Sequence, residues 1–367
     1  MSRNTIPSVL GVRCLAALAA LAALASTAAA QSAAPAQQRG PQSINPGELW
    51  PDDRGQHVQA HGGGIIKHRG LYYWFGEQRG QDLPRGQRAV SCYSSPDLVN
   101  WTFRRNVLTV TAADRPADLP GTGLVLERPK VFYNAKTKRF VMYVHLDDSG
   151  YRAAEVGVAT SETVDGDYKL VKHFRPLGQQ SRDIGQFIDD DGTPYLIFED
   201  RPNGWHIATL SDDYLSVEKD VHLFPEHMEG GALVHLDGLY YAIGSHLTGW
   251  AANPNLYATA TSLEGPWSEF TDIAPPETKT YGSQSTMLVK VAGTRATTVI
   301  FMGDIWRPRT QWDSRYLWMP LKIGDGKLLL PEPRQWTLDI TTGEAVIDEQ
   351  APAMALPPPT PRANSLP

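Results

Sequence analysis

The chain repeats one pattern of polar and apolar positions five times. Each copy opens with a polar residue, runs through small residues into a short apolar strand, turns, and returns as an aromatic or apolar strand. The clearest copy is Met228–Ser245, MEGGALVHLDGLYYAIGS. Self-similarity at a period of roughly 50 residues is typical of propellers and arrays. Aligned on their turns, the copies place five polar residues in one equivalent position: His61, Glu127, Asp183, Glu229 and Gln284.

Each opening pair of strands is followed by a second pair. In the first copy, Arg88–Ser94 alternates as a strand, residues 95–100 turn, and Trp101 begins another strand. Apolar residues alternate or form short runs, and do not recur at the spacing of an amphipathic helix. Four strands in each of five units predict an all-β fold, a five-bladed β-propeller with four antiparallel strands per blade.

The N-terminal 30 residues have the features of a secretory signal peptide. Arg3 and Arg13 form a basic start, an Ala-rich apolar stretch follows, and Ala28–Ala30 supplies small residues for cleavage. The alternative is an uncleaved membrane anchor, but the apolar run is shorter than the ~20 residues that a span needs. We therefore expect residues 1–30 to be removed and the mature protein to be secreted or periplasmic.

Composition sets the remaining boundaries and narrows the partners. Residues 31–43 are rich in Gln, Ala and Pro and predict a disordered tether, and residues 349–367 predict a Pro-rich disordered tail. The propeller is therefore expected at 44–348. A net charge of −6 and a pI near 5.9 give no basic face for nucleic acid. After signal cleavage we expect a monomer without membrane contact, in which Cys92 is a small packed hydrophobe.

The five equivalent residues define the candidate chemistry. If they begin the innermost strands, they converge at one end of a central channel. Glu127, Asp183 and Glu229 would concentrate negative charge there, and like charges at close range raise at least one pKa. A carboxylic acid that stays protonated near neutral pH serves as a general acid. Glycoside hydrolysis needs such an acid together with a second group that activates water.

An Asp opening the third unit and a Glu opening the fourth make the chain similar to glycoside hydrolase family 43, over essentially the whole predicted domain. This is a family of inverting, five-bladed propeller enzymes. The resemblance implies that Glu229 is the general acid and that Asp183 tunes and orients it. The first unit departs from the family, because most members carry an aspartate as general base where this chain has His61 followed by two glycines.

The missing base and three motifs resemble the exo-β-1,3-galactanase branch of that family. The motifs are QAHGGG at residues 59–64, YYWFGE at 72–77 and GSQST at 282–286. In that branch a glutamine of the fifth blade positions the attacking water, or activates it through its imidic form, and Gln284 matches this glutamine. The resemblance further implies a set of residues that bind sugar hydroxyls: Glu77, Glu127 and Tyr151, to which we add His61.

Each of these assignments has a structural alternative. Asp183 is alternatively a buried structural partner of Arg182 or Arg128. Gln284 is alternatively a packing residue, and His61 a satisfied polar residue near the axis. Glu77 and Glu127 are alternatively salt bridges between blades, and Tyr151 loop surface. The loop tryptophans are either sugar platforms or packing residues: Trp205, Trp250, Trp306 and Trp312.

No cofactor is required by this chemistry, and no metal site is assigned. The sequence leaves open whether a structural calcium ion binds in the channel. The run Asp189–Gly192 suggests calcium but lacks the later Glu of an EF-hand, so it favours a hairpin turn.

The sequence therefore predicts a secreted, inverting exo-glycosidase that releases galactose from β-1,3-galactan, the main chain of arabinogalactan. Its partner would be a polysaccharide or oligosaccharide substrate. Two alternatives stay open: an α-L-arabinofuranosidase of the same family, and a sugar-binding propeller without catalysis.

Overall fold

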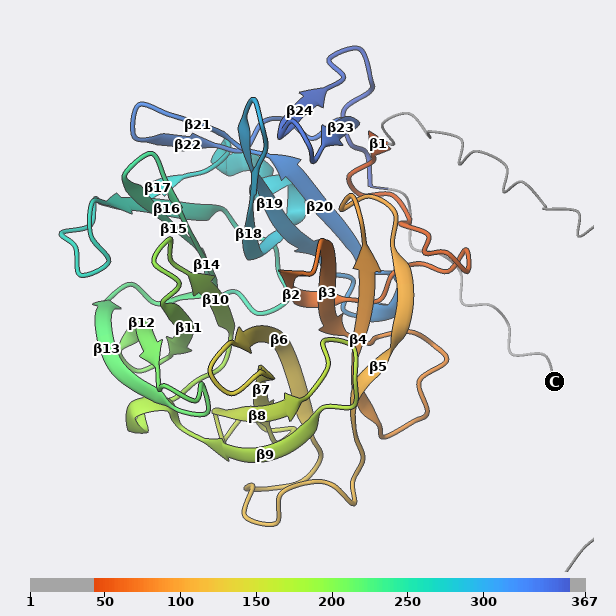
Figure 1. Cartoon of the computed structure of the whole chain (residues 1–367), viewed down its shortest axis with the longest axis vertical. Coiled ribbons are helices and arrows are strands. Elements are labelled where there is room, and N and C mark those ends of the chain that lie inside the picture. The colour runs from red at the N-terminus through yellow and green to blue at the C-terminus, as the bar shows by residue number, and fades with distance from the viewer. Residues whose placement is uncertain (1–42, 357–367) are drawn as a thin grey trace, which may run out of the picture. The chain divides into compact units, whose positions relative to one another are not determined.

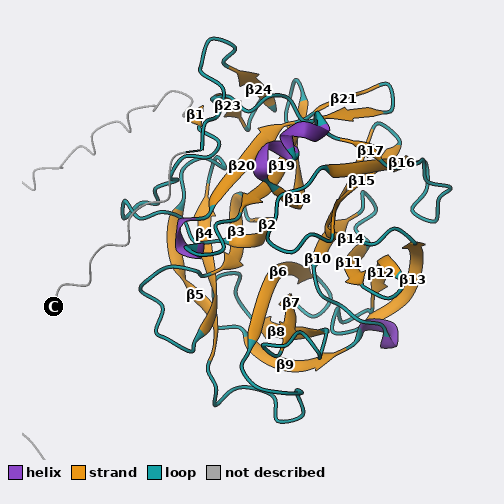
Figure 2. Cartoon of the chain, turned by 180° about the vertical axis from the view of Figure 1, so that it is seen from behind, coloured by secondary structure: helices purple, strands orange, loops and turns teal. Residues whose placement is uncertain are grey.

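The computed structural model describes residues 43–356. The predicted signal peptide, nearly all of the tether and the end of the tail lie outside this range. Within it the fold is all-β, as predicted (Figure 2). The helical segments found there are short 3-10 turns: Pro176–Gly178, Pro276–Thr278, Thr280–Gly282 and Gln311–Asp313. No helix in residues 43–356 is both long enough and apolar enough to cross a membrane.

Five antiparallel sheets follow one another along the chain (Figure 1). The first holds β2 (His61–His68), β3 (Leu71–Glu77), β4 (Arg88–Ser95) and β5 (Thr102–Val110). The second holds β6 (Val125–Asn134), β7 (Arg139–Asp147), β8 (Glu155–Ser161) and β9 (Lys169–Phe174). The third holds β10 (Ile184–Ile188), β11 (Pro194–Asp200), β12 (Gly204–Leu210) and β13 (Val217–Phe224). The fourth holds β14 (Met228–Leu236), β15 (Leu239–His246), β16 (Asn255–Ala260) and β17 (Thr271–Asp272).

The fifth sheet departs from the predicted four strands. It holds only β18 (Gln284–Ala292), β19 (Thr297–Ile305) and β20 (Arg315–Pro320). The chain then forms a separate hairpin, β21 (Lys322–Gly324) and β22 (Lys327–Leu329), before Pro331 and Pro333 remove two backbone donors. A further small sheet pairs β1 (Ser43–Ile44) with β23 (Trp336–Asp339) and β24 (Glu344–Ile347).

The first strand of each sheet lies innermost (Figure 1). These strands contact one another in the order β2, β6, β10, β14, β18, and β18 contacts β2 again. Lys130 on β6 connects two of them, because its Nζ donates to the carbonyl oxygens of Gly62 and Gly63 at 2.7 and 3.0 Å. Burial and the charge of Arg128 lower the pKa of Lys130 to about 7. The space between the inner strands is therefore filled by side chains.

An extra residue directly after the opening polar residue kinks β2, β6 and β14. The backbone there has a positive φ, 57° at Gly62, 52° at Arg128 and 65° at Gly230. Such β-bulges re-aim the neighbouring side chain. A Cβ atom on Gly62 would lie 2.4 Å from Glu77 Oε1, so a side chain here would displace the Glu77 carboxylate.

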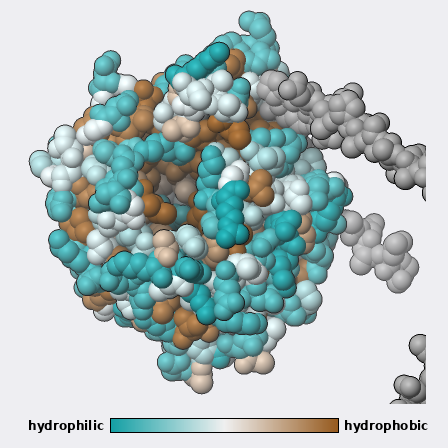
Figure 3. All heavy atoms as spheres, in the orientation of Figure 1, coloured by the Kyte–Doolittle hydropathy of each residue, from teal (hydrophilic) through white to brown (hydrophobic). Residues whose placement is uncertain are grey.

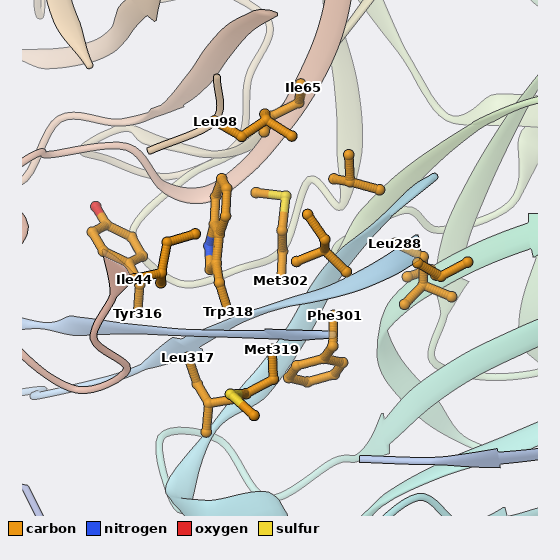
Figure 4. Packing of buried hydrophobic residues seen from close by; sticks show 14 of the residues in the cluster. Ile44, Ile65, Leu98, Leu288, Phe301, Met302, Tyr316, Leu317, Trp318 and Met319 are labelled. Carbon is orange, nitrogen blue, oxygen red and sulfur yellow. The ribbon is translucent and has the colours of Figure 1, made fainter. Parts of the chain in front are cut away.

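The largest apolar cluster of the described residues joins the first, fourth and fifth sheets, and the buried Trp318 and Met302 of the fifth belong to it (Figure 4). The small terminal sheet covers it, since Trp336 Nε1 donates to the Trp318 carbonyl at 2.8 Å. Cys92 is fully buried in a second cluster, which confirms it as a packed hydrophobe. Hydrophilic residues dominate the face shown in Figure 3, with apolar residues in scattered groups.

The chain stays in contact with this sheet beyond position 348. Met354 N donates to the Pro333 carbonyl at 2.7 Å, and Arg334 donates to the Ala351 carbonyl. The contacts continue to within a few residues of position 356, where the described part ends.

Candidate active site

A pocket of about 260 Å³ lies where the inner strands begin. Six of the seven residues predicted from the sequence line it: Glu77, Glu127, Tyr151, Asp183, Glu229 and Gln284. Residues that were not assigned to it also take part, chiefly Arg128, His145, Arg182, Glu199 and Arg201. The pocket residues that the alignment of the repeats predicted lie up to 157 positions apart, from 127 to 284.

His61, the seventh residue, does not line the pocket. Its side chain is fully buried, stacks on Tyr316 with ring centroids 4.8 Å apart, and places Nδ1 3.0 Å from Asp304 Oδ1. Its ring nitrogens therefore face protein groups and not a sugar. This geometry matches the alternative of a satisfied polar residue near the axis.

A second set of polar residues faces the opening residues from the next strand of each unit. In the register of the sheets, Glu127 pairs with His145, Glu229 with Ser245, and Gln284 with Asp304. In the first unit Glu77 pairs with His61. In the third unit Glu199 lies across from Asp183, because Glu199 N donates to the Asp183 carbonyl at 2.9 Å. Aligning the ends of the second strands in the sequence would have found His145, Glu199 and Asp304.

Glu229 occupies the most acidic part of the pocket. One carboxylate oxygen each of Asp183, Glu199 and Glu229 lie within 4.8 Å of one another. Burial, with the charges of Asp183 and Glu199, raises the pKa of Glu229 to about 9. A carboxyl group in this setting keeps its proton at neutral pH, which is the condition for a general acid.

Asp183 is held in place by two donors to the same oxygen. Arg128 Nη2 lies 2.7 Å from Asp183 Oδ2, and Gly230 N donates to that oxygen at 3.1 Å. Because Gly230 directly follows Glu229, this contact ties Asp183 to the strand that carries Glu229. The aspartate therefore acts on the glutamate through both charge and backbone position.

The orientation of the Gln284 amide follows from its partners. Arg128 and Trp306 both contact one end of the amide, Trp306 Nε1 at 2.9 Å, and these two side chains can only donate. That end is therefore the oxygen. The amide nitrogen then donates to Glu229 Oε1 at 2.9 Å and to Ser245 Oγ at 3.3 Å.

Arg128 links three of the predicted residues. Its guanidinium contacts Asp183 and Gln284, and its backbone N donates to Glu77 Oε1 at 3.0 Å. It is 4% exposed and sits in the bulge of β6 with a positive φ, a conformation that costs a non-glycine residue energy. These contacts offset that cost and fix the bottom of the pocket.

Glu127 and Tyr151 form a second polar wall. Tyr151 Oη donates to Glu127 Oε1 at 3.1 Å, and His145 Nδ1 lies 3.4 Å from Glu127 Oε2. Burial alone would raise the pKa of Glu127, but its contact with His145 and the charge of Arg79 lower the pKa to about 2. Glu127 is thus an ionised acceptor. Glu77, ion-paired to Arg79, lies beside it.

The tryptophans separate into two groups. Trp250 and Trp306 line the pocket, with ring centroids 5.3 Å apart in an edge-to-face arrangement. Trp205 is buried against Phe224, and Trp312 does not line the pocket. Only the first pair offers ring surface to a ligand.

The acidic group fits a divalent cation poorly. Arg128 pairs with Asp183, Arg201 Nε lies 2.6 Å from Glu199 Oε1, and Glu229 has a raised pKa. The run at 189–192 is the turn between β10 and β11, in which Asp190 pairs with Lys290 and His235. We therefore derive no step that uses a metal.

Solved structures with the same fold act on galactans. A variant of an exo-β-1,3-galactanase from Phanerochaete chrysosporium, in complex with β-1,3-galactotriose, is 38% identical with a TM-score of 0.76 over 83% of this chain and 70% of that chain. An exo-β-1,3-galactanase from Clostridium thermocellum is 33% identical with a TM-score of 0.75 over 83% of this chain and 68% of that chain. These relatives are glycoside hydrolases.

The family model described as glycosyl hydrolases family 43 matches residues 63–299. The chain belongs to this family, which confirms the resemblance inferred from its repeats. A curated relative, the β-D-galactofuranosidase xynD of Aspergillus niger, is 30% identical over 216 residues. That match covers 53% of this chain and 59% of the relative, so the chain spans well under two thirds of the relative's length.

Proposed function

We propose that the protein is a secreted, inverting exo-glycosidase that releases galactose from β-1,3-galactan, and that its five sheets are the blades of a five-bladed β-propeller. The observation that carries the proposal is the buried Glu229, whose pKa its acidic neighbours raise, beside Asp183 and Gln284 in a single pocket. The family and the galactan-specific relatives support the substrate. As expected from the sequence, the protein would act as a monomer.

In this proposal Glu229 donates its proton to the leaving oxygen. Gln284 Nε2 already donates to Oε1 of Glu229. The carboxyl proton is therefore assigned to Oε2, which is left to face the glycosidic oxygen. Asp183 and Glu199 keep the proton in place by their negative charge. General acid catalysis of this kind contributes about 10²- to 10⁴-fold in rate.

Gln284 would hold the attacking water. Inverting enzymes separate their two groups by about 6.5–9.5 Å so that sugar and water fit between them. Here the Gln284 amide contacts Glu229 directly, so an entering sugar must replace this hydrogen bond and free an N–H for the water. Two donors at the amide oxygen oppose the imidic form, whose oxygen carries a proton. We therefore favour the positioning role.

The pocket supports action at a chain end. Arg128 and the buried Lys130 fill the channel below it, so a polysaccharide cannot thread through. A volume of about 260 Å³ is below the range of roughly 300–1,000 Å³ typical of drug-sized ligands. A pocket of this size suits one terminal sugar ring, bound by Glu77, Glu127 and Tyr151 and flanked by Trp250.

The test is hydrolysis of β-1,3-galactan followed by NMR that resolves the anomers. We expect galactose as the small product and its α-anomer as the first form released, because the attacked bond is β and the mechanism inverts. Endo-products or an initial β-anomer would overturn the proposal. Calorimetric binding of galactan without any released galactose would instead establish a sugar-binding propeller.

The Aspergillus niger relative favours a second candidate, hydrolysis of β-D-galactofuranosides. A panel of β-1,3-galactobiose, nitrophenyl β-D-galactofuranoside and nitrophenyl α-L-arabinofuranoside separates the candidates. Under our proposal kcat/KM is highest for the galactobiose. Preference for either furanoside would replace galactan as the substrate while leaving the roles of Glu229 and Asp183 intact.

A further inference from the structure

Arg182 differs from the other arginines that line the pocket. Arg128 is paired with Asp183 at 2.7 Å and Arg201 with Glu199 at 2.6 Å. Arg182 has no carboxylate within ion-pair distance among the described residues. Its Nη2 donates to the Tyr151 carbonyl at 2.9 Å and its Nη1 to the Gln180 amide oxygen, both neutral acceptors. Its Nε is buried without a hydrogen-bond partner.

This arrangement leaves the half-buried Arg182 at the wall of the pocket without a direct ion pair. Withdrawing a charged group from water costs free energy unless an opposite charge pairs with it. Burial and the neighbouring charge of Arg201 disfavour the charged form and lower the pKa of Arg182, and the more distant charges of Glu199 and Asp147 offset this only in part. A guanidinium stays charged in proteins all the same. An anion placed at this wall would offset both effects.

The two guanidiniums are carried by rigid elements. Arg182 lies two residues before β10, and Arg201 directly follows β11. Arg182 N donates to the Glu199 carbonyl at 3.1 Å. Arg201 Nη2 lies 3.8 Å from Glu229 Oε2, beyond hydrogen-bonding distance. Binding groups supported by strand ends are held more precisely than groups on long loops. The wall is thus a preformed basic edge of a pocket that is otherwise acidic.

We propose that Arg182, with Arg201 beside it, is a subsite for the carboxylate of an acidic sugar, a uronic acid, at the edge of the pocket. The inference rests on the proposed function only in taking the pocket to bind sugar. A planar guanidinium fork matches a carboxylate in two parallel hydrogen bonds. Gln180, whose amide oxygen now accepts from Nη1, is the neutral group that the carboxylate replaces.

One negative charge suits the site better than two. Glu77, Glu127 and Asp183 line the same pocket, and a doubly charged phosphate would meet their repulsion. A single carboxylate matches Arg182, the one arginine lining the pocket that has no direct ion pair among the described residues. The ligand class is therefore a monoanionic sugar, and the carboxylate is preferred over a sulfate ester because of its planar shape.

Isothermal titration calorimetry with galactose, galacturonate, galactose 6-sulfate and acetate tests the subsite without any hydrolysis. We expect the native protein to bind galacturonate about tenfold more tightly than galactose at low salt, since a charge-assisted hydrogen bond contributes roughly 1.5–3 kcal/mol. This preference should shrink as salt is added. In Arg182→Gln the two sugars should bind alike, and Arg182→Lys should keep part of the preference as a point charge.

Arg175→Gln is the matched control. Arg175 is close enough to affect the charge of Arg182, but it donates only to the Ala153 and Arg152 carbonyls and does not line the pocket. The Arg175→Gln variant removes one positive charge from the same region, and its preference for galacturonate over galactose should survive. Thermal unfolding of each variant checks that it is folded. If Arg182→Gln does not fold, Arg182→Lys tests the subsite.

Three results would overturn the subsite. They are equal affinities for galactose and galacturonate in the native protein, a preference that survives Arg182→Gln, and acetate or the sulfate ester binding as tightly as galacturonate. Failure of the proposed function can be told apart from failure of the subsite. A galacturonate preference without galactose release from galactan keeps the subsite and removes the activity, whereas galactan hydrolysis with equal affinities removes the subsite alone.

Discussion

The first and fourth units open with the same local structure and end in different chemistry. His61 and Glu229 are each followed by two glycines, and each strand bulges after its polar residue. The glycine after the polar residue has a φ of 57° in one unit and 65° in the other. Even the support is alike, because Gly62 N donates to Asp304 Oδ2 at 3.0 Å and Gly230 N to Asp183 Oδ2 at 3.1 Å.

The two units differ in what surrounds the aspartate that accepts from the glycine N–H, which is Asp304 in the first unit and Asp183 in the fourth. Asp304 also contacts His61, and Tyr316 stacks on the same ring, so the first unit is closed within the protein. Asp183 instead contacts Arg128, and it faces Glu229 as a like charge that raises the pKa of the glutamate. A repeated backbone therefore decides where a polar side chain lies, and adjacent units decide what it does.

Replacing Glu229 by Gln should have the largest effect on turnover. The amide keeps the hydrogen bond with Gln284 but has no proton of suitable acidity, so kcat should fall by about 10²- to 10⁴-fold. Release of galactose from β-1,3-galactotriose measures the rate. The temperature of unfolding should stay close to that of the native protein. A variant that turns over at the native rate would remove Glu229 as the acid.

Arg128 should come next, since it contacts Asp183, the aspartate that supports the fourth unit, whereas Asp304, which supports the first unit, contacts His61. Arg128→Met releases the Gln284 amide and leaves Asp183 without its cation, and misplaced catalytic groups of this kind cost about 10²-fold. We expect the loss in kcat more than in KM. Arg128→Lys should restore part of it, because the charge near Asp183 returns without the fork to Gln284. Equal losses in both variants with unchanged folding would contradict the positioning role.

Most of the fold was predictable because it repeats. A two-residue alternation and five similar units give the sheets and place the opening residues together, which needs no knowledge of side-chain contacts. The fifth sheet was predicted less well, since the chain leaves it after Pro320 and builds a separate hairpin. The order of contacts among inner strands then follows from chain order.

The site was predictable only in part. Aligning the first strands found Glu127, Asp183 and Glu229, but it treated His61 as equivalent to them. The fate of His61 depends on Asp304 and Tyr316, which lie more than 240 positions away and carry no local signal. Arg128 was weighed only as a structural partner of Asp183, since a residue in a bulge breaks the alternation from which its direction would be read.

Removing the His61 side chain should affect stability and spare the chemistry. His61→Ala leaves Asp304 buried without one partner and opens a cavity beside Tyr316, so unfolding should become easier by about 1–3 kcal/mol. Denaturant unfolding measures this change. The kcat of the folded fraction should stay near that of the native protein. Loss of kcat without loss of stability would mean that the first unit takes part in catalysis after all.

Asp183→Asn should cause the smallest change and test the comparison most directly. In the proposed mechanism Glu229 acts while protonated, so kcat/KM of the native protein should fall as pH rises through its pKa of about 9. Asp183 is one of the charges that raise this pKa, and removing it lets Glu229 ionise at lower pH. The alkaline limb should move down by about one pH unit. Asp304→Asn removes the aspartate that supports the first unit. Asp304 is not among the main charges that shift the pKa of Glu229, so the alkaline limb of this variant should not move.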